Sequence, residues 1–577
     1  MRLHFSPINT LPVIIAFGWF LLFAHNGLWA QFSIDDLTNL HGYLSRSPAS
    51  LMVDNLHYWS TSYRPLGGLF YVALYRWFGF DPLPFRVACF GLLALNLGLL
   101  WRFTLRLSGS REVAFLALLL AGYHAWFVDL YYSTGTVYDL LCYSFYLGAF
   151  NLYLGVRGQG LVPAWRHLGI LIALYVCALN AKEMAVTLPV MLAAYEVIYH
   201  WRALGESGRH WPWREGRGVL AAGLLTVPYV IGKLTAAGNL AENPAYQLTI
   251  SPGRYLHTFH LYLNPLLYQE HVFRDANTIQ LLLAMLGIAL WRRSRPLLFA
   301  WCFLLVGLLP VAFMAHHAAF FLYLPMAGWS LYAAMLLVMA RRLLVSLLVR
   351  PGRLQGGRVQ MASVVALPLV LTLFLAPYHR QESAKTLRSF EDFQPPSRRV
   401  AGELIALRPS LPHGARVLFM DHPFARNQYF LTFLTRLLYR DMSITVEEVP
   451  AGHVPPAGNG HYDAVFTFQK GRLIGIGAAI TRRPLPHQKA ATARVGSGVS
   501  RVQLFDRQLV TRQGAGRLRS TGRQLQDRMR GETGRQPPWG NRVPYLAYFP
   551  LLVEVEQVDG KLHEKRVDRF TWNDPQT

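Results

Sequence analysis

The feature that most constrains this chain is a series of long apolar stretches, all of which lie before residue 378. Each is close to the ~20 residues that a helix needs to cross a bilayer. Hydrophobic residues make up 53% of the chain and charged residues only 15%, against about 25% in soluble proteins. We therefore expect a mainly α, polytopic membrane bundle of eleven spans. The stretches are 11–30, 83–101, 112–131, 134–154, 165–181, 182–200, 218–236, 277–291, 296–315, 318–339 and 360–377.

The basic residues indicate how the spans are oriented. With the N-terminus inside, the cytoplasmic loops carry 17 arginines and the outer loops only six basic residues, which satisfies the positive-inside rule. The first stretch, 11–30, is long for a signal peptide and lacks a clean small-x-small cleavage site, so we interpret it as an uncleaved span. The apolar segment 65–79 is too short to cross and is expected as a helix along the outer interface, and 255–268 is expected to be interfacial or re-entrant.

Residues 165–200 are too long for a single span. A helix of that length would extend ~54 Å, against a hydrocarbon core of ~30 Å. The polar sequence from Asn180 to Glu183 lies in its middle. We therefore predict two spans joined at the outer surface.

An odd number of spans leaves residues 378–577 outside the cytoplasm. The expected organisation is a transmembrane domain, 1–377, with an outer loop at 31–82, followed by a soluble α/β domain, 378–577. Within 400–475, helical and strand patterns alternate. A flexible, basic segment is expected near 507–540 and a hairpin turning at Asp559-Gly560 within 543–572.

Several classes of function are disfavoured by the sequence. The α/β part has no glycine-rich phosphate loop, so a nucleotide site is not expected. The net charge of +24 is accompanied by no nucleic-acid recognition motif, so we expect no nucleic-acid partner. The four cysteines all lie in apolar stretches without metal-ligand spacing.

Unusual polar residues collect on the predicted outer face. Ionisable groups at membrane depth are costly and usually functional. Taken alone, each has a structural explanation: a helix cap for the aspartate pair, an internal ion pair for Lys182 and Glu183, interfacial polarity for the histidines. Their convergence from five hairpins favours a site. The candidates are Asp35, Asp36, His57, Tyr63, Arg64, Asp129, Asp139, Lys182, Glu183, His316, His317 and Tyr323.

Four short motifs in order resemble those of a known family. They are the acidic pair after the first span, "RPL", "NAKEMAVTLP" and "LLP…H…FLYLPMAG". Together they resemble the GT-C glycosyltransferases, and most closely the branch that includes protein O-mannosyltransferases and lipid-A sugar transferases. The resemblance covers about residues 8–340. The chain departs from the family in having Asp-Asp where Asp-Glu is frequent and "RPL" where "PPL" is frequent.

The resemblance implies a hexosyl- or pentosyltransferase of the cell envelope. The donor would be a sugar on a polyprenyl phosphate, and the acceptor a lipid, glycan or protein hydroxyl. Asp35 is the expected base, with Asp36 assisting the acceptor, the sugar or a metal. Arg64, Lys182 and His316 or His317 would bind the donor phosphate. The substrate-binding set would be His57, Tyr63, Asp129, Asp139, Glu183 and Tyr323.

The same resemblance sets the expected surroundings of the protein. It implies a multi-pass protein of the bacterial inner (plasma) membrane, in contact with membrane lipids, with its active site and C-terminal domain extracytoplasmic. No cofactor is required by the pattern, and a divalent metal remains open.

Two other classes of protein are compatible with many spans and external charges. A transporter or flippase of lipid-linked sugars would place its polar groups near the bilayer midplane and often shows paired halves. Here the polar groups lie at one predicted surface and no half-repeat is visible. The third class is a membrane-anchored binding protein in which residues 378–577 do the work.

Overall fold

We describe the protein from a computed structural model. It covers residues 7–54, 64–235, 249–269, 272–314, 317–348, 355–424, 429–452, 462–476, 501–505, 508–511, 552–558 and 561–568. The candidates His57, Tyr63 and His316 lie outside these ranges, as does most of the segment predicted to be flexible near 507–540.

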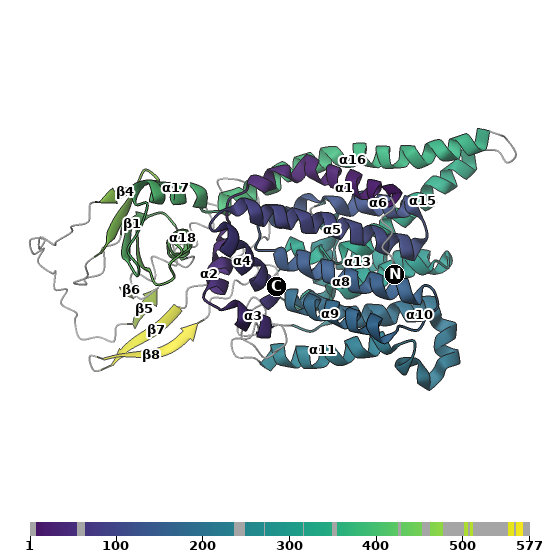
Figure 1. Ribbon diagram of the computed structural model, residues 1–577, viewed down its shortest axis with the longest axis horizontal. Helices are drawn as coiled ribbons and strands as arrows, with labels where there is room; N and C mark the ends of the chain where they lie inside the picture. The colour runs from purple at the N-terminus through teal and green to yellow at the C-terminus, as the bar shows by residue number, and fades with distance from the viewer. Residues whose placement is uncertain are drawn as a thin grey trace, which may run out of the picture.

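Long helices run side by side and form the body of the molecule (Figure 1). Each of the eleven predicted apolar stretches falls on helical structure, so their helical character is confirmed. The long helices are α1 Pro7–Ala24, α5 Pro82–Ser108, α6 Arg111–Gly122, α8 Val137–Arg157, α9 Trp165–Ala181, α10 Leu188–Ser207, α11 Arg217–Thr235, α13 Asp275–Trp291, α14 Arg295–Ala312, α15 Met326–Leu348 and α16 Gln355–Phe393.

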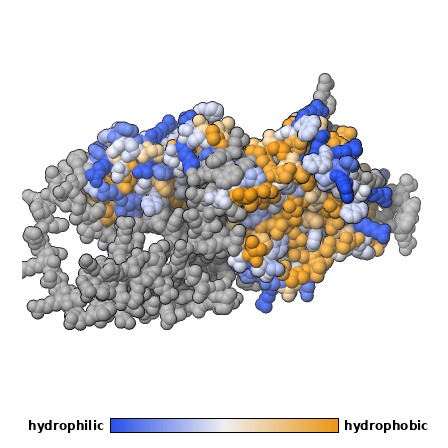
Figure 2. Space-filling view, turned by 90° about the horizontal axis from the view of Figure 1, so that it is seen from below, coloured by the Kyte–Doolittle hydropathy of each residue, from blue (hydrophilic) through white to orange (hydrophobic). Residues whose placement is uncertain are grey.

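Five helical segments in the described ranges are long and apolar enough to cross a membrane. They are Thr10–Trp29, Pro82–Ser108, Arg295–Ala312, Met326–Leu348 and Gly357–Leu407. A bent pair, Arg111–Gly122 with Ala125–Tyr132, makes a sixth if it counts as one span, and α9 and α13 are apolar but shorter. Apolar side chains cover the body of the bundle (Figure 2). The chain thus has the helices of a membrane protein, and the number eleven stays a prediction.

The breaks between helices have local causes. The predicted break in 165–200 is confirmed, because α9 ends at Ala181, a 3-10 turn η3 spans Glu183–Thr187, and α10 starts at Leu188.

Two predicted stretches differ from the helices observed. The stretch 112–131 bends by 50° after α6, and continues in η2 Ala125–Phe127 and α7 Val128–Tyr132. The stretch 318–339 begins as a 3-10 turn, η7 Ala319–Leu322, and α15 starts only at Met326. Pro325 precedes that start, and a proline with fixed φ and no N–H favours a helix beginning there.

One end of the bundle carries short helices. These are η1 His25–Trp29, α2 Ile34–Leu44, α3 Pro48–Asp54, α4 Pro65–Phe78 and α12 Pro252–Leu266. The segments 65–79 and 255–268 form α4 and α12, and their position at a membrane interface stays a prediction. In Figure 1, α2, α3 and α4 lie between the bundle and a small sheet.

The small sheet and two helices form what we call the C-terminal unit, residues 397–476. Its elements are α17 Ser397–Leu407, β1 Arg416–His422, α18 Phe430–Leu438, β2 Thr445–Pro450, β3 Ala464–Gln469 and β4 Arg472–Ile476. The strand order is β2-β1-β3-β4, with β1 parallel to both neighbours and β3-β4 a hairpin. The helix and strand pattern predicted for 400–475 is confirmed.

A second, antiparallel sheet follows in the order β6-β5-β7-β8. Its strands are β5 Arg501–Phe505, β6 Gln508–Thr511, β7 Leu552–Val558 and β8 Lys561–Asp568. β7 and β8 pair antiparallel, with Val558 opposite Lys561, so the predicted hairpin is confirmed, whereas its turn at Asp559-Gly560 lies outside the described residues. The prediction of a flexible segment from 507 is wrong at its start, since residues 508–511 form β6.

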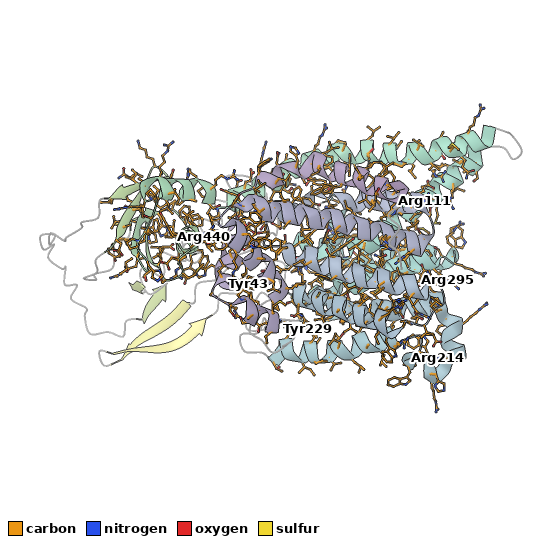
Figure 3. The ribbon with its side chains drawn as sticks, in the orientation of Figure 1. Tyr43, Arg111, Arg214, Tyr229, Arg295 and Arg440 are labelled. Atoms are coloured by element: carbon orange, nitrogen blue, oxygen red, sulfur yellow. The ribbon has the colours of Figure 1, made fainter. Side chains whose placement is uncertain are left out.

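The two ends of the bundle differ in the residues they carry. Figure 3 places Arg111, Arg214 and Arg295, three of the arginines predicted to be cytoplasmic, at the end remote from the C-terminal unit. Tyr43 and Arg440 lie at the opposite end. We call the end with α2 to α4 the loop end, and the other the arginine end.

Candidate functional site

The site is built on the first turn of α2. Ser33 is its N-cap, and the Asp36 backbone N–H donates to the Ser33 hydroxyl at 3.2 Å. In return the Ser33 N–H donates to Asp36 Oδ2 at 2.9 Å, which completes a capping box. The capping explanation of the acidic pair is therefore correct for Asp36. The turn leaves Asp35 at the second helical position.

Asp36 is fully buried and fully bonded. Its Oδ2 also accepts from Arg86 Nη2 at 2.8 Å, and Arg86 is only 1% exposed. Its Oδ1 accepts from the hydroxyls of Ser133 at 3.0 Å and Thr134 at 2.7 Å. Four donors thus occupy about four lone-pair positions of one carboxylate. Asp36 ties α2 to α5 and to the segment after α7.

Asp35 is different, although it is adjacent in sequence. Its carboxylate forms no hydrogen bond or ion pair with any residue that the structure describes. It lies against Gly135, where an added Cβ would come within 2.9 Å of the Asp35 Cβ. Burial, followed by the neighbouring negative charge of Asp36, raises the pKa of Asp35 to about 6. An unpaired carboxyl with such a pKa is suited to accept a proton near neutral pH.

Two ion pairs lie close to the same end. Arg64, the residue before α4, donates to Glu183 with 2.8 Å between Nη2 and Oε2. Lys182 Nζ lies 2.5 Å from Asp139 Oδ1, and both side chains are almost completely buried. The internal Lys182–Glu183 pair considered from the sequence is replaced by these two pairs. The reason is that Lys182 has extended φ and ψ of −160° and 146°, so its side chain and that of the next residue point in different directions.

Aromatic rings surround the Lys182 ammonium. Its Nζ lies 4.4 Å from the ring centroid of Phe320 and 4.7 Å from that of Phe321. Cation–π contact of this kind partly compensates a desolvated ammonium. The "FFLY" segment before α15 therefore contributes to the site through its phenylalanines.

Tyrosines connect the surroundings of the acidic pair with the cations. The Tyr71 hydroxyl donates to the Thr134 carbonyl at 2.6 Å, and its ring stacks on Tyr43. Tyr138 donates to the Tyr43 hydroxyl at 3.3 Å, and its ring lies 5.2 Å from the Arg64 guanidinium. The two parts of the site thus share one packed, hydrogen-bonded surface.

Two glycines after "RPL" make this packing possible. A Cβ at Gly67 would come within 2.1 Å of the Tyr138 ring, and one at Gly68 within 2.6 Å of the Tyr43 ring. No side chain fits there without displacing a tyrosine. The sequence "RPLGG" therefore lets the rings lie directly on the first turn of α4.

Lys233 was missed by the sequence analysis. It lies in the last turn of α11, with Nζ 5.9 Å from the Tyr229 ring centroid, and the charges of Glu183, Arg64 and Asp54 act on it. Within the described ranges no carboxylate pairs with it. Figure 3 places Tyr229 toward the loop end. A lysine inside a predicted span is itself an unusual signal, and it could have identified this residue.

The remaining candidates lie in other surroundings. Tyr323 accepts from Asn96 at 3.2 Å, lies with its ring tilted by 36° against that of Tyr143, and lines a small cavity with both. His317 lies beside Arg254 and the Tyr262 ring. Asp129 is half-buried at the start of α7. None of these contacts places the three residues directly beside Asp35 or Lys182.

The segment before the C-terminal unit closes the start of α2. Gln394 Oε1 accepts from the Ile34 N–H at 3.1 Å, and the Ser397 hydroxyl donates to the Phe32 carbonyl at 2.6 Å. Further along, the His41 ring stacks on Phe433 with centroids 4.6 Å apart. The role of residues 378–577 was open from the sequence; here they help to fix the helix that carries Asp35.

No protein-family model matches this chain, and a search of curated proteins finds no significant relative. The resemblance to GT-C glycosyltransferases therefore rests on the four motifs alone.

Proposed function

We propose that the protein is a membrane glycosyltransferase, which moves a sugar from a polyprenyl-phosphate donor to the hydroxyl of an acceptor. One observation carries the proposal. A half-buried carboxylate, Asp35, has no partner among the described residues and lies at the same end of an apolar helical bundle as a cluster rich in buried cations. These are the two kinds of group that such a transfer needs.

Asp35 is the proposed base. In the reaction, the acceptor oxygen forms a bond to the anomeric carbon while the bond from that carbon to the phosphate oxygen breaks. The acceptor proton passes to the Asp35 carboxylate. Asp36 cannot take this role in its present arrangement, because its lone pairs are occupied by Ser33, Arg86, Ser133 and Thr134. For the same reason Asp36 is poorly disposed to hold a metal.

The cations serve the leaving group. A lipid phosphate leaves as an anion, and fixed positive charges stabilise the charge that grows on it. Arg64 and Lys182 are neutralised by Glu183 and Asp139, whereas Lys233 has no such partner in the described part of the chain. The five groups together carry one net positive charge, which an incoming phosphate would meet.

The arginines support an extracytoplasmic site. The arginine end carries residues of the predicted cytoplasmic loops, and the positive-inside rule favours such residues on the cytoplasmic side. The proposed reaction is therefore extracytoplasmic, with donor and acceptor reaching the site from the outer leaflet or beyond. The sugar and the acceptor class are to be found by assay.

The test is transfer by purified protein in lipid vesicles. A panel of labelled polyprenyl-phosphate sugars is supplied, and release of polyprenyl phosphate is measured. Wild type should turn over at least one donor, and Asp35→Asn should be slower by about 10²-fold or more. Asp81→Asn is the matched control, because Asp81 caps α5 in an exposed position and asparagine caps equally well.

The outcomes separate the alternatives. Folded Asp35→Asn with normal turnover would remove Asp35 as the base. Movement of labelled donor across the vesicle membrane, with no release of polyprenyl phosphate, would favour a flippase over a transferase.

A further inference from the structure

A second group of ligating side chains lies away from the proposed base. His257 and His260 are three residues apart on α12, and Asp275 is the first residue of α13. One ligand atom from each residue can be chosen so that all three lie within 4.8 Å of one another. His260 Nδ1 and Asp275 Oδ1 are 2.5 Å apart, and the two imidazole centroids are 4.8 Å apart.

The helix that carries the two histidines is held firmly. The buried Thr258 hydroxyl donates to the Ala312 carbonyl at 2.7 Å, and the Tyr255 hydroxyl donates to the Leu305 carbonyl at 2.9 Å. Both acceptors belong to α14. The position of α12 on the bundle is therefore fixed from the face opposite to the solvent.

The backbone just before the aspartate is bonded to α12. The Asn264 side-chain amide donates to the Phe273 carbonyl at 2.9 Å, and its oxygen accepts from the Phe273 N–H at 2.8 Å. Asp275 follows two residues later. The ligands thus stand on an ordered framework, which is what a preorganised metal site requires.

We propose that His257, His260 and Asp275 bind a divalent transition metal of the zinc class. Two imidazoles and one carboxylate form a donor set typical of zinc, whereas magnesium and calcium prefer oxygen ligands. Residues at i and i+3 lie on one face of a helix, so both rings can reach one ion. The ion would take the place of the proton between His260 and Asp275.

The ligand atoms are not yet at the spacing of a bound ion: His260 Nδ1 and Asp275 Oδ1 are closer, at 2.5 Å, whereas other pairs are up to 4.8 Å apart. Metal–ligand bonds of ~2.0–2.1 Å place tetrahedral ligands ~3.4 Å apart. Rotamer changes at the exposed side chains of His257 and Asp275 would bring the three ligand atoms to that spacing. The exposed side of the site leaves coordination positions for water or for an external ligand. A simple ion pair between His260 and Asp275 needs no third ligand, so only metal binding gives His257 a role.

A bound ion would link α12 to α13 at the loop end. Its ligands belong to neither of the two ion pairs of the candidate site, and the inference does not rest on the proposed glycosyl transfer. Metal binding and transfer are accordingly tested by different measurements.

The experiment uses full-length protein in detergent, without a histidine tag and freed of metal by chelation. Zn²⁺ is titrated at pH 7.5, stoichiometry is measured by elemental analysis, and Co²⁺ is added separately to record its visible absorption. Wild type should bind one ion with micromolar or tighter affinity and become more heat-stable. Mg²⁺ should produce neither effect.

Two variants and a control decide the result. His260→Gln keeps a hydrogen-bond donor for Asp275, and His257→Gln alters an exposed position, so both are designed to fold. Each should weaken Zn²⁺ binding at least tenfold and reduce the Co²⁺ absorption. His413→Gln removes an exposed histidine that pairs with Asp441 and should bind like wild type. Unchanged binding in both His257→Gln and His260→Gln, or no stoichiometric binding by wild type, would overturn the proposal.

Discussion

The two ends of the bundle hold their buried charges in different ways. At the arginine end, the Arg157 guanidinium donates two hydrogen bonds of 2.8 Å to the Glu196 carboxylate, and the Tyr153 hydroxyl donates to the same carboxylate at 2.9 Å. Both charged side chains are at most 2% exposed. At the loop end, Glu183 is 27% exposed, and Lys233 and Asp35 have no ionic partner in the described ranges.

The difference separates structural charges from available ones. A buried pair whose lone pairs and N–H groups are matched has little left with which to bind a ligand, and it serves to fix neighbouring helices. At the loop end, the described residues leave the Lys233 ammonium and the Asp35 carboxylate without an ionic partner, so a ligand that bonds to them can still gain binding free energy. The sequence shows charged residues at both ends; only their partners distinguish the two roles.

The largest effect is expected from breaking the closed pair. Arg157→Met leaves the Glu196 carboxylate buried without its cation, which should lower the free energy of unfolding by about 3–5 kcal/mol. Chemical denaturation in detergent, monitored by tryptophan fluorescence, measures this change. Arg166→Met is the matched control, since Arg166 is exposed on the neighbouring helix. A loss below about 1 kcal/mol would contradict the structural role of the pair.

Replacing Lys182 should affect both the stability of the protein and its use of the donor. Lys182→Met leaves Asp139 buried and unpaired, so both stability and donor use should fall, the latter by about 10²-fold in kcat. The double variant Lys182→Met/Asp139→Leu removes both charges and should regain stability but not donor use. If the double variant also regains turnover, Lys182 is only a structural partner of Asp139.

Lys233 supplies the contrast to Lys182. Because it has no carboxylate partner in the described part of the chain, Lys233→Met should leave heat stability unchanged and raise the KM for donor. Lys385→Met, at an exposed position on α16, is the control for this comparison. A loss of stability in Lys233→Met without any change in donor KM would remove Lys233 from the cation cluster.

The smallest effect concerns pH. Because the pKa of Asp35 is raised to about 6 and the deprotonated form accepts the proton, turnover should be half-maximal near pH 6 and fall about tenfold per unit below it. The protonated carboxyl favours the folded state. Its contribution to the free energy of unfolding is fully present below the ordinary pKa of 3.8 and is lost as the pH rises through 6.

Asp35→Asn should therefore have a higher Tm than wild type at pH 8 and lose this advantage below pH 4. A turnover profile that is flat from pH 5 to 8 would separate Asp35 from the chemistry.

The helices were predictable because length and apolar composition act locally. The break after Ala181 followed from the helix length that a bilayer allows, and the α/β pattern of 400–475 followed from periodicity. The start of α15 was missed because Pro325 was not weighed as a helix-start signal.

The partners of the charged residues could not be predicted. Lys182 meets Asp139 because α8 packs on α9, and Asp36 meets Arg86 because α2 lies against α5. Such pairing depends on tertiary packing across 43 and 50 residues. Sequence spacing instead suggests the neighbour, Glu183, whose side chain points elsewhere.

The bond from the Ile34 N–H to Gln394 has a consequence for biosynthesis. A ribosome makes the chain from its N-terminus, so α2 is synthesised some 360 residues before the amide that accepts from its first N–H. Until Gln394 arrives, the Ile34 N–H beside Asp35 must be satisfied by water. A nascent chain that stalls before residue 394 would contain its apolar helices and yet lack the bond that completes the surroundings of Asp35.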